Sequence, residues 1–295
     1  EKKQNINSDY GEGIGHYPIT TKSGLRHTSA DIFLTPAIKR KNLTLMKHCA
    51  VTKLVFKDQR VKRVDFVQGS KKKKSVNIRV GAILAAGAIN SPQILMLSGV
   101  GPRTDLQNHG IDVLIQNESV GRNLQDHLGI DYLYETKEKS LNKVLGSWRG
   151  RIPAALRYLF FRRGPFSLSV NQAGGFARWN SQRQDANLQL YFNPVTYSVK
   201  RNPKKRELLQ PDKFDGFAIG FQPCRPQSRG FVTLKSNDPL VSPVINPKFL
   251  EAESDFQDVL SGIQCMVSLT SNKSLRSIIV APRSIDLENS TESEK

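Results

Sequence analysis

The side chains that most often carry chemistry are few and widely spaced in this sequence. Its histidines and cysteines are His16, His27, His48, His109, His127, Cys49, Cys224 and Cys265. The three cysteines show no Cys-x-x-Cys spacing and cannot all pair with one another, so the sequence supports neither a zinc site nor a disulfide framework. We therefore expect no metal site.

Two glycine-containing segments could approach a phosphate or a cofactor. In Gly11–Gly15 the glycines alternate as in a phosphate loop, but no strand precedes them and no capped helix follows, which predicts a flexible loop. The apolar run Val80–Ala86 instead predicts a buried strand that turns at Gly87. Ser91 and Pro92 suit the cap and first turn of a following helix. This strand–turn–helix pattern is typical of a dinucleotide-binding sheet, where ligands bind at the carboxyl ends of strands.

Charge is the most unusual feature of the composition. The 295 residues include 44 Lys and Arg against 26 Asp and Glu, a net charge of +18, which suggests a nucleic-acid or anionic-membrane partner. The densest run, Lys71–Lys74, lies between two expected strands without an interleaved aromatic residue. We interpret it as a solvated hairpin tip and predict no nucleic-acid partner. No uncharged apolar run approaches the ~20 residues that cross a bilayer, so we predict no membrane span.

Hydrophobic patterning outlines the elements that must position any site. Residues 43–84 contain β-branched runs that predict strands, and short alternating runs over residues 170–250 predict an antiparallel sheet. Residues 227–250 could return to the edge of the first domain or join this sheet, and the sequence leaves both open. The segment 251–276 predicts a helix whose apolar face contains Phe256, Val259, Leu260 and Ile263.

The segment Trp148–Arg163 combines aromatic and aliphatic side chains with arginines, and we expect a helix that ends at Gly164-Pro165. Two environments fit this composition. A basic amphipathic helix can lie on a membrane surface. A partly buried helix whose arginines reach solvent fits as well, and the sequence alone favours this second interpretation.

Four blocks, in order along the chain, carry a resemblance to a known family. The most specific is Gly87–Gly101, GAINSPQILMLSGVG, and another is Val120–His127, VGRNLQDH. The other two are Gly24–Ala30 with 41–43 and 51–54, and Ser228–Gly230 with 232–234 and 238–239. Together they resemble the glucose–methanol–choline (GMC) FAD-dependent oxidoreductases. Within this family the sequence resembles the insect glucose-dehydrogenase-like branch.

The resemblance implies an enzyme that oxidises the CH–OH group of an alcohol or sugar by hydride transfer to FAD. A histidine near the C-terminus of the family takes the hydroxyl proton. Carried over by position, Val51 offers backbone contacts to the FAD adenine, and Ala86 and Gly87 lie close to the cofactor. Val51 could also be a plain strand core residue. The implied partner of the intact parent is a small-molecule alcohol or sugar.

The sequence departs from the family pattern at both ends. It contains no strand–GxGxxG–helix opening, and no His-containing block follows Lys273. We therefore interpret the chain as an internal fragment, inactive alone and retaining little FAD, with the catalytic histidine C-terminal to it. The alternative is a catalytically inactive GMC-derived binding protein with a basic surface.

These observations predict an α/β fold with three regions. Residues 1–125 form a partial Rossmann-like FAD-binding domain without its GxGxxG start, and residues 126–226 form an α+β antiparallel-sheet substrate domain. Residues 227–295 begin the C-terminal GMC region. Localisation is left open, although Asn-x-Ser/Thr sequons would suit an extracellular parent, and these start at Asn42, Asn117, Asn272 and Asn289.

Overall fold

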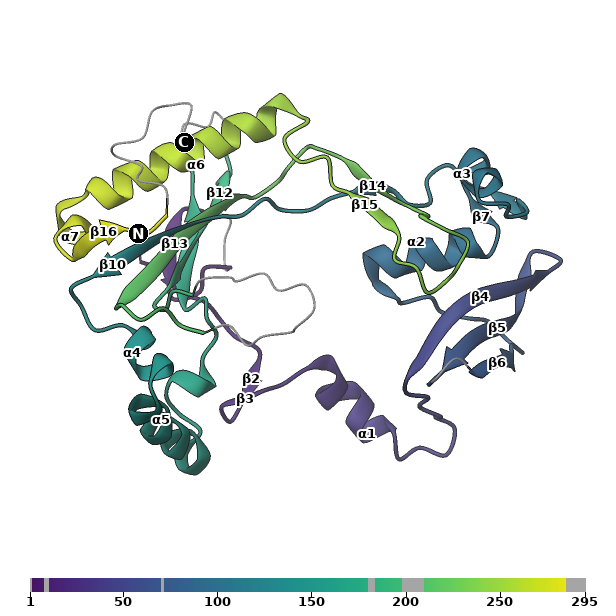
Figure 1. The fold of residues 1–295 in the computed structure, drawn as a ribbon, viewed down its shortest axis with the longest axis horizontal. Helices are drawn as coiled ribbons and strands as arrows, with labels where there is room; N and C mark the ends of the chain where they lie inside the picture. The colour runs from purple at the N-terminus through teal and green to yellow at the C-terminus, as the bar shows by residue number, and fades with distance from the viewer. Residues whose placement is uncertain (1, 8–10, 70–71, 180–183, 198–209, 285–295) are drawn as a thin grey trace. The chain divides into compact units, whose positions relative to one another are not determined.

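The computed structural model describes residues 2–7, 11–69, 72–179, 184–197 and 210–284 (Figure 1). The chain forms two compact units. Unit 1 contains Glu1–Pro36, His127–Pro226 and Glu253–Lys295, and unit 2 contains Ala37–Asp126 and Gln227–Ala252. Residues 1–36, which we expected on the cofactor side, therefore pack with the residues from His127 onward. Lys71 and Asn289 lie outside the described residues.

Unit 1 is built on a six-stranded sheet in the order β1-β11-β12-β13-β10-β16, and all its pairs are antiparallel. Its strands are β1 Gly13–His16, β10 Ile130–Thr136, β11 Ala173–Ala177, β12 Leu188–Asn193, β13 Gly216–Pro223 and β16 Ile279–Pro282. The predicted antiparallel sheet is confirmed. The flexible loop expected over Gly11–Gly15 is wrong, because Gly13–His16 pairs with β11, where a side chain at Gly175 would overlap the carbonyl of Gly13.

One face of this sheet is covered by helix α6, Glu253–Ser271. The core between them includes Phe221, Ile263 and Met266, which are 0%, 7% and 1% exposed. A side chain at Gly262 would overlap the Phe221 ring, so the helix approaches the sheet closely there. Of the predicted apolar face, Val259 and Ile263 are buried, but Phe256 and Leu260 are exposed. The buried face is rotated from the predicted one and includes the small residue Gly262.

The remaining elements of unit 1 are short, apart from α5. They are β2 Thr21–Lys22, β3 Leu25–Arg26, the π-helix η1 Ala30–Leu34, α4 Leu141–Gly146, α5 Trp148–Phe161, the 3-10 helix η2 Pro165–Ser167 and α7 Lys273–Arg276. Helix α1, Thr35–Ala37, continues η1 at the boundary of the two units. No described helix is both long and apolar enough to cross a membrane.

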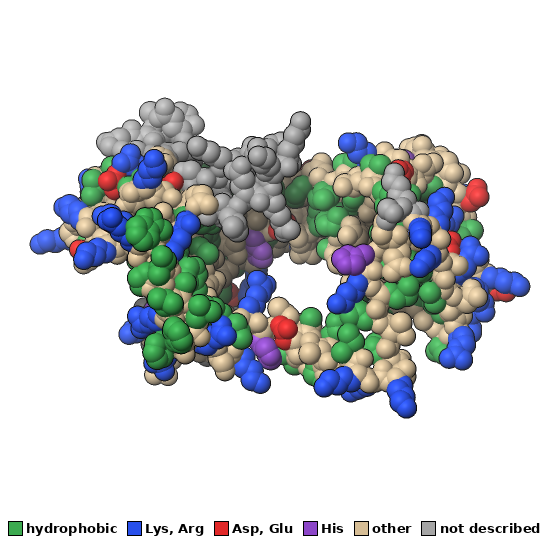
Figure 2. Space-filling model, turned by 60° about the horizontal axis from the view of Figure 1, so that its bottom comes forward, with side chains coloured by type: hydrophobic (Ala, Val, Ile, Leu, Met, Phe, Trp, Pro, Cys, Tyr) green, Lys and Arg blue, Asp and Glu red, His purple; other side chains and the backbone are tan. Residues whose placement is uncertain are grey.

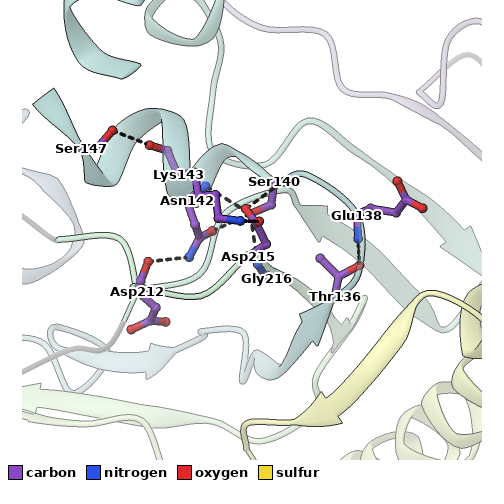
Figure 3. A network of polar contacts seen from close by, with 9 residues as sticks. All are labelled: Thr136, Glu138, Ser140, Asn142, Lys143, Ser147, Asp212, Asp215 and Gly216. Atoms are coloured by element: carbon purple, nitrogen blue, oxygen red, sulfur yellow. Dashed lines mark hydrogen bonds and ion pairs between the residues drawn. The ribbon is translucent and has the colours of Figure 1, made fainter. Parts of the chain in front are cut away.

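A buried polar network fixes the start of α4 (Figure 3). The Asn142 side chain is fully buried; its Nδ2 donates to Thr196 Oγ1 at 2.8 Å and its Oδ1 accepts from the Thr196 amide at 3.0 Å. Asp215 accepts from the Ser140 amide at 3.1 Å and pairs with Lys143 at 2.6 Å. Burial acts to raise the pKa of Asp215, but the hydrogen bonds from Lys143 and Ser140 outweigh it and lower that pKa. The network ties α4 to the residues that follow β12 and to those that precede β13.

We predict that Asn142→Ala destabilises unit 1 by about 2–4 kcal/mol, because it leaves the buried Thr196 amide and hydroxyl without their partner. Urea unfolding followed by circular dichroism measures the change. The matched control is Asn90→Ala, at an exposed helical position, which should change stability by less than about 0.5 kcal/mol. Equal effects of the two substitutions would contradict the role assigned to the network.

Unit 2 contains a three-stranded antiparallel sheet, β4-β5-β6, and a second one, β15-β14-β9. Its elements are β4 Cys49–Lys57, β5 Arg60–Gln68, β6 Lys72–Asn77, α2 Gly87–Leu97, β7 Val100–Gly101, α3 Arg103–Asn108, β8 Ile115–Gln116, β9 Arg122–Leu124, β14 Gly230–Thr233 and β15 Val244–Asn246. Met96, Leu97, Leu106 and Leu234 form its small core. The returning segment 227–250 therefore pairs inside unit 2 and does not join the large sheet.

Three local predictions in unit 2 need correction. The run Val80–Ala86 forms no strand: Val80 and Ile83 are 103% and 97% exposed, and no described strand lies beside them to pair with. Helix α2 begins at Gly87, so Pro92 lies inside it, and Ser91 Oγ accepts from the Ala86 amide at 3.1 Å. Lys72–Lys74 belong to β6 and are exposed there, so they are solvated but do not form a hairpin tip.

Candidate functional site

The sheet of unit 1 has a second, polar face opposite α6. Along β12 the side chains of Leu188 and Leu190 enter the core, whereas Gln189, Tyr191 and Asn193 alternate with them and point to the other face. Their cross-strand neighbours follow the same rule, since Gln189 is paired with Gln222 and Tyr191 with Gly220. Gly220 is in turn paired with Asp131 of β10. A patch of polar side chains from three adjacent strands results.

This polar face forms the floor of a cavity of about 500 Å³ in unit 1. Its side chains are joined by hydrogen bonds. Gln222 Nε2 donates to Gln189 Oε1 at 2.8 Å, and Gln189 Nε2 donates to the Tyr17 hydroxyl at 3.2 Å. The Tyr17 hydroxyl itself donates to the Leu190 carbonyl at 2.7 Å. These contacts hold amide and phenol groups in fixed directions around the cavity.

Gly220 allows the central contact of the cavity. A Cβ atom at this position would overlap the Tyr191 ring and would lie 2.6 Å from Asp131 Oδ1. The absence of a side chain lets the Tyr191 ring lie over β13, where its hydroxyl is near enough to the Asp131 carboxylate to affect the pKa of that group. The same hydroxyl lies 3.3 Å from the Ile130 carbonyl oxygen. Tyr191 and Asp131 thus form one pair across β13.

Burial sets the electrostatics of this pair. It raises the pKa of Asp131, and the hydrogen bond from Tyr191 opposes that shift only in part. Burial and the nearby Asp131 carboxylate both raise the pKa of Tyr191, so its hydroxyl stays protonated as a donor. Asn193 Oδ1 also lines this region and is buried without a hydrogen-bond partner among the described residues. Neutral donors, acceptors and one carboxylate suit a ligand with several hydroxyl groups.

We predict a pH-dependent effect of Asp131→Asn. Because the pKa of Asp131 is raised in the folded protein, the wild type loses stability as the pH rises from the ordinary carboxyl range through that raised value. The asparagine variant does not titrate there. Its stability relative to wild type should therefore increase from about pH 4 to about pH 7, measured by urea unfolding. A difference that is constant or shrinks with pH would contradict the assignment.

In unit 2, three of the four sequence blocks meet around a cavity of about 420 Å³. Ser91 and Pro92 come from the block Gly87–Gly101, and Gly121–Gln125 come from the block Val120–His127. Val232 comes from the block that begins at Ser228. The strand pairing of β9 with β14 brings the last two together. Segments more than a hundred residues apart in the sequence therefore line one site.

A left-handed glycine makes this meeting possible. Gly121 has a φ of 78°, and a side chain there would overlap the Val232 carbonyl. The Val232 amide donates to the Gly121 carbonyl at 2.7 Å. Beside it, Arg122 pairs with Asp105 at 3.0 Å and lies over the Phe231 ring. The cavity wall is thus fixed by backbone contacts and one ion pair.

The structure places the predicted cofactor residues at the edge of this region. Ala86 and Gly87 are exposed at the start of α2, next to Ala88 of the cavity lining. Gly87 has a φ of 83°, and the space where a Cβ atom would lie is open, which is the geometry that close approach of a cofactor requires. The residues present therefore fit contact with FAD at this point.

Val51 lies in β4 and does not line the same cavity. Its side chain is 38% exposed, so it is no core residue. Its neighbour Thr52 lines a different cavity of about 850 Å³ together with Ser98 and Gly99. Helix α2 packs on β4, and the Ser98 hydroxyl accepts from the Leu54 amide at 2.8 Å. The roles of Val51, Ala86 and Gly87 toward FAD remain predictions.

The remaining histidines and cysteines lie outside the cavities described above. His109 Nδ1 lies 2.8 Å from the Asp105 carbonyl oxygen, and His127 Nε2 lies 3.2 Å from that of Cys224. Burial raises the pKa of Cys224 and Cys265 to about 11, so both are thiols at neutral pH. Among the described residues, no cluster of three or more metal-ligating side chains is present.

The comparison with protein families decides the relationship. Two models, both described as GMC oxidoreductase, match residues 1–129 and 226–295. The chain belongs to the GMC oxidoreductase family. The predicted family and its FAD cofactor are thereby confirmed, whereas the insect glucose-dehydrogenase-like branch is not shown.

Curated relatives of this GMC chain include two dehydrogenases. An alcohol dehydrogenase [acceptor] of Pseudomonas putida is 34% identical over 90% of the chain and 48% of its own length. An oxygen-dependent choline dehydrogenase of Brucella anthropi is 32% identical over 88% of the chain and 45% of its own length. The chain thus spans about half the length of the curated relatives it matches.

Solved structures share the fold. A formate oxidase of Aspergillus oryzae, from a study of FAD modification, superimposes with a TM-score of 0.83 at 23% identity, over 95% of this chain and 52% of that one. A pyridoxine 4-oxidase from Mesorbium loti gives 0.75 at 22% identity, over 96% and 50%. The predicted α/β fold class is confirmed.

Proposed function

We propose that the protein containing this chain is an FAD-dependent oxidoreductase that oxidises the CH–OH group of a small polar alcohol or sugar. The observation that carries the proposal is the meeting of three family blocks around the cavity beside α2. The names of the two dehydrogenase relatives agree with oxidation of an alcohol. The finer assignment to an insect glucose-dehydrogenase-like protein rests on sequence blocks alone and is part of the proposal.

In this proposal one unit binds the cofactor and the other binds the substrate. Unit 2 holds the cofactor, with Ala86 and Gly87 close to FAD and Val51 in backbone contact with its adenine. FAD, when bound, supplies the two-electron acceptor for the hydride. We assign the cofactor side to unit 2, residues 37–126 and 227–252, and the substrate side to unit 1, which includes residues 1–36 and 127–226.

Unit 1 supplies the substrate side through its polar sheet face. Asp131 and the amides of Gln189 and Gln222 hold hydroxyl groups of the substrate, and Tyr191 fixes Asp131 in place. The polar lining favours a sugar or a comparable polar alcohol over a sterol. No described histidine lines this cavity, so the proton of the reacting hydroxyl is assigned to a histidine C-terminal to this sequence.

The exposed run Val80–Ala86 supports the cofactor role of unit 2. Its large apolar side chains are Val80, Ile83 and Leu84, and Val80 and Ile83 are fully exposed. Such a run is energetically unfavourable in water and suits a strand enclosed on both faces. We assign it to a parallel sheet that also includes strands from outside this sequence.

The test uses the protein from the uninterrupted gene, purified with its native ends. We predict a visible flavin spectrum and anaerobic bleaching by sugars or small polar alcohols, without bleaching by a sterol. Gly220→Ala should lower the bimolecular rate of bleaching at least ~10-fold at unchanged flavin content, because the new methyl group displaces Tyr191 and Asp131.

The matched control is Gly146→Ala, where a Cβ atom meets only ordinary contact at 3.9 Å, and which should react like wild type. A protein without flavin absorbance would overturn the oxidoreductase proposal and favour the alternative, a catalytically inactive binding protein with a basic surface. Bleaching by the sterol alone would instead contradict the polar substrate class.

A further inference from the structure

Helix α5 presents an apolar stripe to solvent. Large side chains recur along it at positions i, i+4, i+8, i+11 and i+12, which places them on one helical face. They are Trp148, Ile152, Leu156, Leu159 and Phe160. All are exposed, from 48% at Leu156 to 76% at Phe160. The sequence favoured a partly buried helix, and this prediction is wrong for these side chains, which are exposed.

The opposite face of α5 explains why the stripe points outward. Ala154 is its only buried side chain, at 7% exposure, and Gly150 lies one turn before it. A side chain at Gly150 would overlap the Val144 carbonyl, so α5 packs against α4 through these two small residues. The five large side chains of the stripe are left on the far side of the helix.

The stripe continues past the helix. Phe166, Leu168 and Val170, in and after η2, are also exposed, at 44%, 52% and 46%. Arg162 ends α5 in the left-handed conformation and η2 packs back on the helix. In Figure 2, hydrophobic side chains gather with Lys and Arg in the part of unit 1 where Figure 1 places α5. We call this surface, Trp148–Val170, the α5 patch.

The charged residues along the sequence of the α5 patch have one sign. Every charged residue between Glu138 and Asp185 is a lysine or an arginine. Arg157 borders the apolar stripe on the helix, and Arg162 and Arg163 follow the end of the helix. The Arg151 guanidinium instead donates to the Leu145 carbonyl and to Gln210 Oε1. The stripe contains aromatic residues, is bordered by arginines and lacks acidic residues. It therefore complements a surface whose outer layer is anionic and whose interior is apolar.

We infer that the α5 patch binds the surface of an anionic lipid bilayer. The helix lies in the plane of the interface, with Trp148 and Phe160 among the acyl chains and the flanking arginines at the lipid phosphates. A symmetric pair formed with a second copy fits less well, because it would bring the arginines of both copies together without an acidic residue between them. The inference does not depend on the proposed redox activity.

The test measures binding of the intact protein to lipid vesicles by co-sedimentation. Vesicles of phosphatidylcholine are compared with vesicles in which about one third of the lipid is phosphatidylglycerol. We expect at least ~10-fold tighter binding to the anionic vesicles, and weaker binding at high salt. Brominated lipids should quench the fluorescence that is lost in Trp148→Phe, which reports insertion of this side chain.

Two pairs of matched variants distinguish binding through the α5 patch from non-specific binding to lipid. Leu159→Ser/Phe160→Ser should bind at least ~10-fold more weakly, whereas Phe33→Ser/Leu240→Ser, at similarly exposed positions, should bind like wild type. Arg157→Gln/Arg163→Gln should likewise weaken binding more than Lys72→Gln/Lys73→Gln on the exposed strand β6. Circular dichroism checks that each variant is folded.

Three results would overturn the inference. One is equal binding to neutral and anionic vesicles, and another is equal loss in the α5 and control variants. The third is a concentration-dependent dimer that Leu159→Ser/Phe160→Ser dissociates without any change in vesicle binding, which would assign the α5 patch to a second copy.

Discussion

The two unlike faces of the antiparallel sheet in unit 1 determine how the rest of that unit is built. Strict alternation along β12 and β13 sends the large apolar side chains to one side, where α6 seals them from water. The same alternation forces Gln189, Tyr191 and Gln222 to the other side. A shift of one residue in register would bury the amides under α6 and expose the core. The polar cavity is therefore a consequence of the core, and both depend on the β12–β13 register.

Glycines at particular positions convert this arrangement into sites. Gly220 gives Tyr191 room to reach Asp131 across β13, and Gly121 allows β9 to approach β14 in unit 2. Gly87 leaves open space at the start of α2. In each case a side chain would close the gap that the contact or the cofactor needs. The chemistry proposed for the protein rests on backbone shape as much as on side-chain type.

Much of this fold could be predicted from the sequence. The antiparallel strands, the helix over 253–271 and the family blocks carry strong local patterns. Asp131 and Tyr191 could not be recognised, because nothing local relates residues 60 positions apart. The alternation of apolar and polar residues in Leu188–Asn193 was the one available signal. The prediction of a strand over Val80–Ala86 was wrong for a different reason. The composition of this run is that of a buried strand, but a strand also requires neighbouring strands to pair with, and none pairs with it among the described residues.

We propose that the polar face of this sheet receives the alcohol that the flavin oxidises. A crystal structure of the intact FAD-loaded protein, soaked anaerobically with a polyol that bleaches it, tests this most directly. We expect density for the polyol within hydrogen-bonding distance of Asp131, Gln189 or Gln222. Density for the polyol beneath α6 or in the cavity lined by Thr52 and Ser98, with the sheet face bare, would contradict it.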